Sequence, residues 1–251
     1  IFTNSSAEDG FKINIEDLKS KISSKTKFII INSPNNPTGR VMSKEELLQI
    51  ADLARENPNI NILSDEIYEL ILKKEFKHYS LSSLANDLKD RIFIINGFAK
   101  GWAMTGWRIG YLVGPKDVIK ASSALQSQST SNVCSFVQKG ALEALKINNE
   151  FFSMINSHYD QRRRLLYEGL NNINGIYIEE PNGAFYAFPK LPNSSITSVD
   201  FCNKALQDYG LVVVPGKAFG ADQCIRISCA ASEIKIKDGL QRLEKAISEY
   251  Y

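Results

Sequence analysis

Histidine and cysteine, two residues that often carry catalysis and metal binding, are scarce in this sequence. Its 251 residues include only two histidines, His78 and His158, which lie far apart and which we expect at the surface. This leaves little material for a histidine-rich metal site or for a Ser-His-Asp triad. If the protein is an enzyme, other groups have to move its protons, and no metal is expected.

The cysteines show no CxxC spacing and lie in apolar or helical contexts: Cys134, Cys202, Cys224 and Cys229. This arrangement argues against a zinc or disulfide framework and favours buried free thiols. Because the cytosol keeps thiols reduced, we expect a cytoplasmic protein. The chain opens with Ile1 instead of an initiator methionine, and its first residues show no signal-peptide pattern.

Long apolar runs and strong charge are also missing. No apolar run approaches the ~20 residues that are needed to span a bilayer. The formal net charge is +2, and the sequence has no basic block or basic stripe interleaved with aromatic residues. We therefore expect neither a nucleic-acid partner nor a membrane partner. A hydrophobic share of 43% is sufficient for the core of one large domain or of two smaller ones.

Strand-like runs alternate with helical patterns in the first half of the chain. Short apolar runs typical of buried strands occupy residues 27–32, 60–65, 91–96 and 109–114. Ser43 and Glu46 have the spacing of a capping box at a helix start, and further helices are predicted over 115–126 and 132–146. This alternation predicts an α/β domain with a largely parallel sheet, which we assign to residues 1–150.

The pattern changes in the second half of the chain. A long helical pattern covers residues 150–171. Short strand-like runs then follow at 177–180, 183–189, 211–215 and 224–229, with helices near 197–209 and 232–250. We assign residues 151–251 to a smaller α+β domain at the carboxyl end of the chain.

Polar residues stand at the ends of the predicted strands of the first half. Asn36 follows the strand that ends at Asn32, Asp65 ends the next strand, and Lys100 lies just past the run 91–96. In an open α/β sheet, ligands bind outside the carboxyl ends of the strands. We therefore expect an amide, a carboxylate and an amine to converge on one crevice.

These groups suit a pyridoxal-phosphate site. A lysine that acts as a nucleophile has to lose its proton, which burial of Lys100 beside a cation such as Arg108 would favour. Such a lysine can form a Schiff base with a carbonyl. A carboxylate at the same level of the sheet can hold a protonated ring nitrogen, and an arginine can bind a phosphate with two hydrogen bonds.

Four motifs in order carry a likeness to a known family. They read "SPNNPTG" (33–39), "SDEIYE" (64–69), "NGFAKGWAMTGWRIGY" (96–111) and "CIRISCA" (224–230). Together they resemble the fold-type-I, class I aminotransferases that use pyridoxal phosphate, and most of all the bacterial aspartate aminotransferases. The likeness continues through "PNGAFYAF" (181–188) and "VVVPGKAFG" (212–220) and covers nearly the whole chain.

The resemblance implies a role for each cofactor-binding position. Lys100 would be the Schiff-base lysine that also shuttles the proton, and Asp65 would pair with the pyridinium nitrogen. Tyr68, which would also act in catalysis, and Asn36 would hydrogen-bond the 3′ oxygen of the ring. Arg108 would bind the phosphate.

The resemblance also implies the substrates and the assembly. Arg226 would bind the α-carboxylate of the substrate, which Asn36 would also contact. The reaction expected is a transamination between an amino acid, with aspartate as the expected donor, and a 2-oxo acid. The family also implies a homodimer.

Two alternatives stay open at the level of sequence. A pyridoxal-phosphate-dependent carbon–sulfur lyase would use Lys100, Asp65 and Arg108 on the same scaffold. A catalytically inert fragment is the other alternative, because family members carry an upstream phosphate-cradling loop and a ring-stacking aromatic that are not found ahead of Ile1. Gly97 is a smaller departure, since many relatives place there a serine that binds the phosphate.

Overall fold

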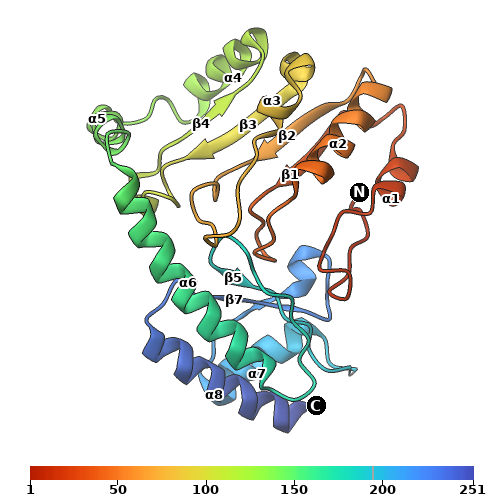
Figure 1. The fold of residues 1–251 in the computed structure, drawn as a ribbon, viewed down its shortest axis with the longest axis vertical. Helices are drawn as coiled ribbons and strands as arrows, with labels where there is room; N and C mark the ends of the chain where they lie inside the picture. Colours follow the sequence, from red (N-terminus) through yellow and green to blue (C-terminus); the bar gives the residue numbers. More distant parts are fainter. Residues whose placement is uncertain (194) are drawn as a thin grey trace.

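The computed structural model describes residues 1–193 and 195–251 and divides their strands between two sheets (Figure 1). The first sheet has the order β1 (Phe28–Asn32), β2 (Asn61–Asp65), β3 (Ile92–Gly97) and β4 (Gly110–Val113). β1 pairs parallel to β2 and β2 parallel to β3, whereas β4 runs antiparallel to β3. The prediction of a largely parallel sheet is confirmed.

One face of this sheet carries the first hydrophobic core. Alternate residues of β1, Ile29 and Ile31, are buried there against α2 (Lys44–Glu56), with α3 (Leu81–Leu84) and the 3₁₀ helix η1 (Asn86–Arg91) completing the layer. The predicted capping box of α2 is present, since Glu46 N donates to Ser43 Oγ and Ser43 N donates to Glu46 Oε2. The opposite face of β1 is open, because Ile30 is 69% exposed.

Helices lead from the first sheet to the second. A short helix, α1 (Ile15–Lys21), precedes β1, and the predicted helices after β4 are present as α4 (Lys116–Ser129) and α5 (Ser135–Ala144). The long helix α6 (Asn149–Asn171) then runs down one side of the molecule, from the level of the first sheet to that of the second (Figure 1). The predicted domain boundary at residue 150 falls at the start of α6 and stays a prediction.

The second sheet is small and antiparallel. Its order is β5 (Tyr186–Ala187), β7 (Ile225–Ser228) and β6 (Val214–Pro215), and the 3₁₀ helix η3 (Gly216–Phe219) follows β6. Helices α7 (Ser198–Tyr209) and α8 (Glu233–Tyr250) pack with α6 around a second core that contains Leu170 and Phe201. This core holds β5 and β7 in place, and both strands contribute to the site described below.

Two expectations, one about a strand and one about a cysteine, are wrong. Residues 177–180 do not form a strand, because only Tyr177 bridges to Lys190, which also bridges to Cys224. The strand-like composition of that segment was not sufficient, since a strand exists only where a partner runs beside it. Cys134 is exposed, whereas the other three free cysteines are buried as expected. Among the described helices, none has both the length and the apolar character needed to cross a membrane.

We predict that Leu170→Ala lowers the free energy of unfolding by about 2–5 kcal/mol, because it removes a fully buried side chain that the surrounding core cannot replace. Urea denaturation followed by circular dichroism measures this change. Leu125→Ala on α4 is the matched control, because Leu125 is 73% exposed and its truncation should change stability by less than about 0.5 kcal/mol. Equal effects of the two substitutions would contradict the assignment of this core.

Candidate active site

The parallel strands bring their carboxyl ends to one edge of the first sheet. Asn32 at the end of β1 lies opposite Asp65 at the end of β2, which in turn lies opposite Ile95 near the end of β3. The segments that leave these strands carry Asn36, Asp65 and Lys100. The convergence of these segments follows from the parallel register.

Asn32 bonds both to the segment that follows β1 and to the neighbouring strand β2. Its Nδ2 donates to the carbonyl oxygen of Asp65 at 3.0 Å, and its Oδ1 accepts from the backbone nitrogen of Asn36 at 2.8 Å. Asn35 then accepts from both the nitrogen and the hydroxyl of Thr38. The turn that presents Asn36 is therefore held by side-chain hydrogen bonds to the sheet and within itself.

Asp65 is a partly buried carboxylate with spare hydrogen-bonding capacity. Its Oδ1 accepts from the backbone nitrogen of Ile67 at 3.1 Å, and among the described residues no partner contacts Oδ2. Burial raises the pKa of Asp65, the bond from Ile67 opposes this, and the nearby Glu66 carboxylate adds to the increase. A cation placed against Oδ2 would offset the cost of ionising Asp65.

Lys100 lies half-buried over two aromatic rings. Its Nζ is 5.6 Å from the ring centroid of Tyr68 and 5.5 Å from that of Phe185. Within residues 1–193 and 195–251, its amine has neither a hydrogen bond nor an ion pair. The amine is therefore held close to the edge of the sheet by ring contacts alone, with its lone pair or protons available to a ligand.

Arg226 links the second sheet to the first. It lies on β7, and its Nη1 donates to Asn36 Oδ1 at 2.9 Å. Its guanidinium also lies 4.6 Å from the ring centroid of Tyr186 and 5.1 Å from that of Phe219. The two rings and Asn36 fix the position of the charged head of Arg226.

Tyr68 completes a continuous path of contacts. Its hydroxyl lies 3.1 Å from that of Tyr186, and the residue is only 3% exposed. Burial is the main cause of a raised pKa for Tyr68, and the hydrogen bond to Tyr186 raises the pKa further. Tyr68 therefore stays a neutral phenol at physiological pH. The path therefore runs from Lys100 through Tyr68 and Tyr186 to Arg226 and Asn36.

Arg108 stands apart from this path. It is exposed, its Nη1 donates to the carbonyl oxygen of Thr105 at 3.1 Å, and the described residues show no contact between it and Lys100. Its backbone is left-handed, with φ of 53° and ψ of 47°, a conformation that is uncommon outside glycine and costs about 1 kcal/mol or more. The structure thus places Arg108 after the 3₁₀ helix η2 (Thr105–Trp107).

Gly97 has a packing reason for lacking a side chain. It pairs with Gly110 across β3 and β4, and a Cβ atom on Gly97 would lie 2.7 Å from the Cα of Gly110 and 2.9 Å from the carbonyl oxygen of Ile109. Because the two strands approach so closely, a serine at this position would require a shift of the backbone.

Sequence analysis assigned no role to Tyr186, Phe185, Phe219 or Asn32. The first two lie in "PNGAFYAF" and Phe219 lies in "VVVPGKAFG", so the likeness of these segments to the family was the available signal. Their contacts join residues far apart in the chain, which local patterns do not reveal. Asn32 could have been found as a polar residue that ends a buried strand.

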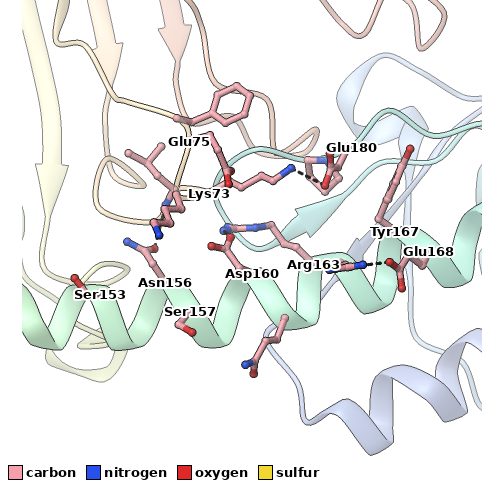
Figure 2. Close-up of a pocket in the computed structure, with 16 residues that line it drawn as sticks. Lys73, Glu75, Ser153, Asn156, Ser157, Asp160, Arg163, Tyr167, Glu168 and Glu180 are labelled. Carbon is pink, nitrogen blue, oxygen red and sulfur yellow. Dashed lines mark hydrogen bonds and ion pairs between the residues drawn. The ribbon is translucent and has the colours of Figure 1, made fainter.

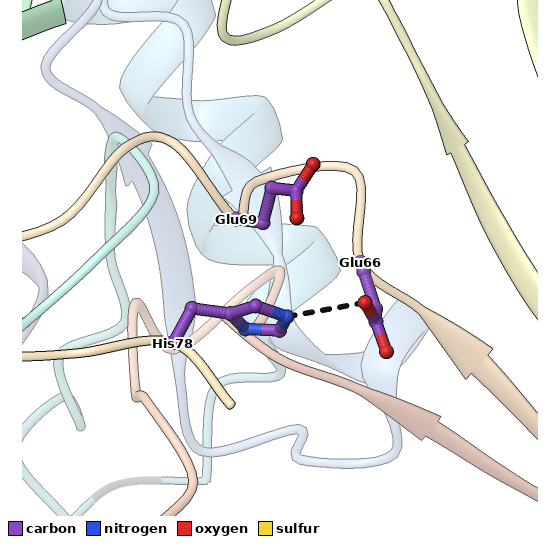
Figure 3. Close-up of side chains that lie close together, drawn as sticks. All are labelled: Glu66, Glu69 and His78. Atoms are coloured by element: carbon purple, nitrogen blue, oxygen red, sulfur yellow. Dashed lines mark hydrogen bonds and ion pairs between the residues drawn. The ribbon is translucent and has the colours of Figure 1, made fainter. Parts of the chain in front are cut away.

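The expectation that His78 lies at the surface is wrong. Its side chain is 11% exposed, and its Nε2 lies 3.2 Å from Glu66 Oε2 (Figure 3). Glu66 Oε1 accepts from the hydroxyls of Ser64 and Ser80, both at 3.0 Å. Glu66 therefore has a donor on each oxygen, as a buried carboxylate requires.

Glu69 joins this group from the other side. One oxygen or nitrogen from each of Glu66, Glu69 and His78 lies within 4.8 Å of the others, a spacing that metal ligands can have (Figure 3). Glu69 Oε1 accepts from Asn96 Nδ2 at 2.7 Å, so both carboxylates already have hydrogen-bond donors. We interpret the group as a polar network that ties the end of β2 to β3 and to residue 78.

A large cavity lies elsewhere, between residues 72–76 and α6 (Figure 2). It has a volume of about 900 Å³, and none of the predicted site residues lines it. Most of its charged groups form ion pairs: Lys73 with Glu180 at 2.8 Å, Arg163 with Asp160, and Arg164 with Glu168. Because these charges are neutralised in pairs, we assign no ligand to this cavity.

Comparison with known proteins gives a consistent result. The family described as aminotransferase class I and II matches residues 1–243. A probable aspartate/prephenate aminotransferase from Rickettsia typhi is 43% identical over 98% of this chain and 64% of its own length. An aspartate aminotransferase from Pyrococcus abyssi is 37% identical, over 96% of this chain and 62% of its own length. The chain thus spans less than two thirds of the length of these relatives.

Solved structures agree with the sequence relatives. An aromatic aminotransferase from Pyrococcus horikoshii superposes with a TM-score of 0.93 at 35% identity, over 99% of this chain and 67% of its own. The aspartate aminotransferase from Thermus thermophilus with maleate gives a TM-score of 0.91 at 38% identity, over 98% of this chain and 63% of its own. The predicted α/β fold class with a smaller α+β part is confirmed by these likenesses.

We predict that Asp65→Asn stabilises the ligand-free protein at neutral pH. Because the pKa of Asp65 is raised on folding, its ionisation costs stability. Below a pH of about 4 the carboxyl is protonated in both states and the penalty is absent. As pH rises through the folded-state pKa the penalty appears, and it persists above that value.

Thermal unfolding of both proteins between pH 4 and pH 8 checks this prediction. The melting temperatures should coincide at the acid end and separate in favour of the variant as pH rises. Asp117→Asn, on the exposed surface of α4, is the control and should show no such divergence. A variant that is less stable than the wild type at pH 7 would refute the argument from burial.

Proposed function

The chain belongs to the class I and II aminotransferase family, and from that premise we propose that its protein transfers an amino group between an amino acid and a 2-oxo acid with pyridoxal phosphate. The observation that carries the proposal is the contact path from the Lys100 amine through Tyr68 and Tyr186 to Arg226. Aspartate is the proposed donor, because relatives from Rickettsia typhi and Pyrococcus abyssi carry that activity in their names.

The residues present fit the cofactor. When bound, pyridoxal phosphate supplies an electron sink for the charge left as a proton leaves the substrate Cα. Asp65 Oδ2, which no described residue contacts and whose carboxyl has a raised pKa, suits the protonated ring nitrogen. Lys100, whose amine lacks a polar partner among the described residues, suits the covalent attachment. Tyr68 and Asn36 would donate to the ring oxygen.

Lys100 would move the proton during the reaction. Its amine lies at the end of a flexible four-carbon chain over the rings of Tyr68 and Phe185. Once released from covalent attachment, an amine in this place can take a proton from the substrate Cα and return it as a general base and acid. Neither His78 nor His158 is needed for this step, in accord with the scarcity of histidine.

Arg226 would bind and orient the substrate. A guanidinium can bind a carboxylate through two parallel hydrogen bonds, which fixes both position and direction. Asn36 Oδ1 accepts a hydrogen bond from Arg226 Nη1, and the rings of Tyr186 and Phe219 lie against the guanidinium. Held in this way, Arg226 would bind the substrate carboxylate and set its orientation.

Three further assignments belong to the same proposal. Arg108, exposed and in a left-handed conformation, would bind the cofactor phosphate. The cytoplasm is the proposed location, supported by free buried thiols such as Cys202 and Cys229. A homodimer is proposed from the family resemblance, and exposed apolar side chains such as Phe136 and Leu145 on and after α5 offer surface for it.

We predict that pyridoxal phosphate adds a visible absorbance band to the protein that carries this chain, and that borohydride fixes the cofactor to Lys100. Peptide mass spectrometry of the reduced protein identifies the lysine. Lys100→Ala should abolish the band and the transamination of aspartate with 2-oxoglutarate. Lys73→Ala, which removes only the ion pair with Glu180, is the control and should retain both.

Labelling of a different lysine would refute this assignment. Release of pyruvate from cystathionine or cysteine without a 2-oxo acid acceptor would instead favour the carbon–sulfur lyase. A folded protein that binds no cofactor would favour the inert fragment.

We also predict that Arg226→Lys raises the KM for aspartate by about 10- to 100-fold, because one ammonium group replaces a bidentate charge-assisted contact. Cofactor affinity should change little, since Arg226 contacts the substrate side of the site. Steady-state kinetics at saturating pyridoxal phosphate measure the change. Arg164→Lys on the exposed side of α6, where Arg164 pairs with Glu168, is the control. An unchanged KM in Arg226→Lys would show that Arg226 does not bind the substrate carboxylate.

A further inference from the structure

We infer that Tyr186 is a positioning residue that couples the cofactor contact of Tyr68 to the substrate contact of Arg226. This inference rests on the proposed function and adds to it a coupling role for Tyr186, beyond its contact with Arg226. Tyr186 touches both groups with different parts of its side chain: its hydroxyl meets Tyr68, and its ring meets Arg226. The two contacts can therefore be removed separately.

The ring contact follows from strand register. Tyr186 on β5 lies directly opposite Ser228 on β7. Successive residues of a strand point to opposite faces, so Arg226 and Ser228 share a face and Arg226 is the diagonal neighbour of Tyr186. At 4.6 Å from the ring centroid, the guanidinium lies within the range of a cation–π contact. The antiparallel pairing of β5 and β7 therefore places an aromatic face under the substrate-binding arginine.

Binding of the cofactor would decide which of the two hydroxyls is the donor. Each tyrosine hydroxyl has one proton, and in the ligand-free structure either Tyr68 or Tyr186 can be the donor across the 3.1 Å contact. If Tyr68 donates its proton to the ring oxygen of the cofactor, its own oxygen has to accept from Tyr186. Among the described residues, the Tyr186 hydroxyl has no other hydrogen-bond partner. Tyr186 is therefore free to be that donor.

This arrangement strengthens the donor that faces the cofactor. A hydroxyl that accepts one hydrogen bond becomes a better donor of its own, by about 10–30% per bond. The effect is not screened by water, because Tyr68 is 3% and Tyr186 is 8% exposed. Tyr186 thus acts on the cofactor through Tyr68 and on the substrate through Arg226.

A merely structural role predicts a different result. If Tyr186 only filled the small core that it shares with Tyr68 and Ile71, the loss of its hydroxyl would leave the electronic state of the cofactor unchanged. The positioning role predicts a change in that state, because Tyr68 stabilises the negative ring oxygen, whose charge is greatest after the bound cofactor loses its proton. A weaker Tyr68 donor makes this proton loss harder.

The test uses the pH midpoint of the visible absorbance of the bound cofactor. Tyr186→Phe keeps the ring and should move the midpoint upward by about 0.3 pH unit, in the same direction as Tyr68→Phe but less far. The double variant Tyr68→Phe/Tyr186→Phe should match Tyr68→Phe alone, because the hydroxyl of Tyr186 acts only through that of Tyr68. The KM for aspartate in Tyr186→Phe should stay within about twofold of the wild type, since the cation–π contact with Arg226 is retained.

Removing the ring should reveal the second contact. Tyr186→Leu should show the same shift in midpoint and, in addition, a KM for aspartate raised about fivefold, through the loss of the cation–π contact. Tyr159→Phe is the matched control: its ring stacks on Phe185 at 5.4 Å in the same aromatic cluster, and its hydroxyl makes no contact with that of Tyr68. The control should leave the midpoint unchanged. Circular dichroism confirms that each variant is folded.

The outcomes separate the inference from the proposed function. A midpoint that moves in Tyr68→Phe but not in Tyr186→Phe overturns the inference and leaves the aminotransferase proposal intact. A midpoint that moves equally in Tyr159→Phe also overturns it. A wild-type protein that shows no visible band with pyridoxal phosphate overturns the proposed function and the inference together.

Discussion

The hydrogen bond from Arg226 Nη1 to Asn36 Oδ1 is the interaction on which the site depends. It joins residues 190 positions apart, one on the second sheet and one on the turn after β1 of the first. Each sheet packs on its own hydrophobic core, so this bond links two parts of the chain that have separate cores. Together with the contact between the hydroxyls of Tyr68 and Tyr186, the bond between Arg226 and Asn36 joins the polar side chains of the two sheets into one site.

Aromatic rings hold the two basic side chains of this site in place without pairing them with an opposite charge. Arg226 lies between the rings of Tyr186 and Phe219, and Lys100 lies over those of Tyr68 and Phe185. A carboxylate in place of any of these rings would hold the cation more strongly but would also compete with an anionic ligand. Ring contacts stabilise a cation by about 0.5–2 kcal/mol while leaving its hydrogen-bond donors free. The site therefore keeps two cationic side chains available in a partly buried place.

The sequence was sufficient for the parts of the site that depend on local pattern. Buried strands that end in Asn32 and Asp65 predicted the edge where Asn36, Asp65 and Lys100 converge, because parallel strands end at the same side. Local pattern could not place Tyr186, whose contacts depend on the register of β5 with β7. It also missed the burial of His78, whose partner Glu66 lies 12 positions away in the chain.

Asp65 and Glu66 show how strand alternation assigns opposite roles to adjacent carboxylates. Ser64 and Glu66 share one face and bond to each other, and Glu66 is further satisfied by Ser80 and His78. The pairing of β2 with β3 continues through Glu66 N, which donates to the carbonyl oxygen of Ile95. Asp65 must therefore point the other way, toward Tyr68, whose pKa its charge helps to raise. A shift of register by one residue would exchange the two carboxylates. Glu66 would then lie at the site, and Asp65 would lie in the interior without its partners. The polar network around Glu66 thus stabilises the fold and also fixes which carboxylate remains available for a cationic ligand.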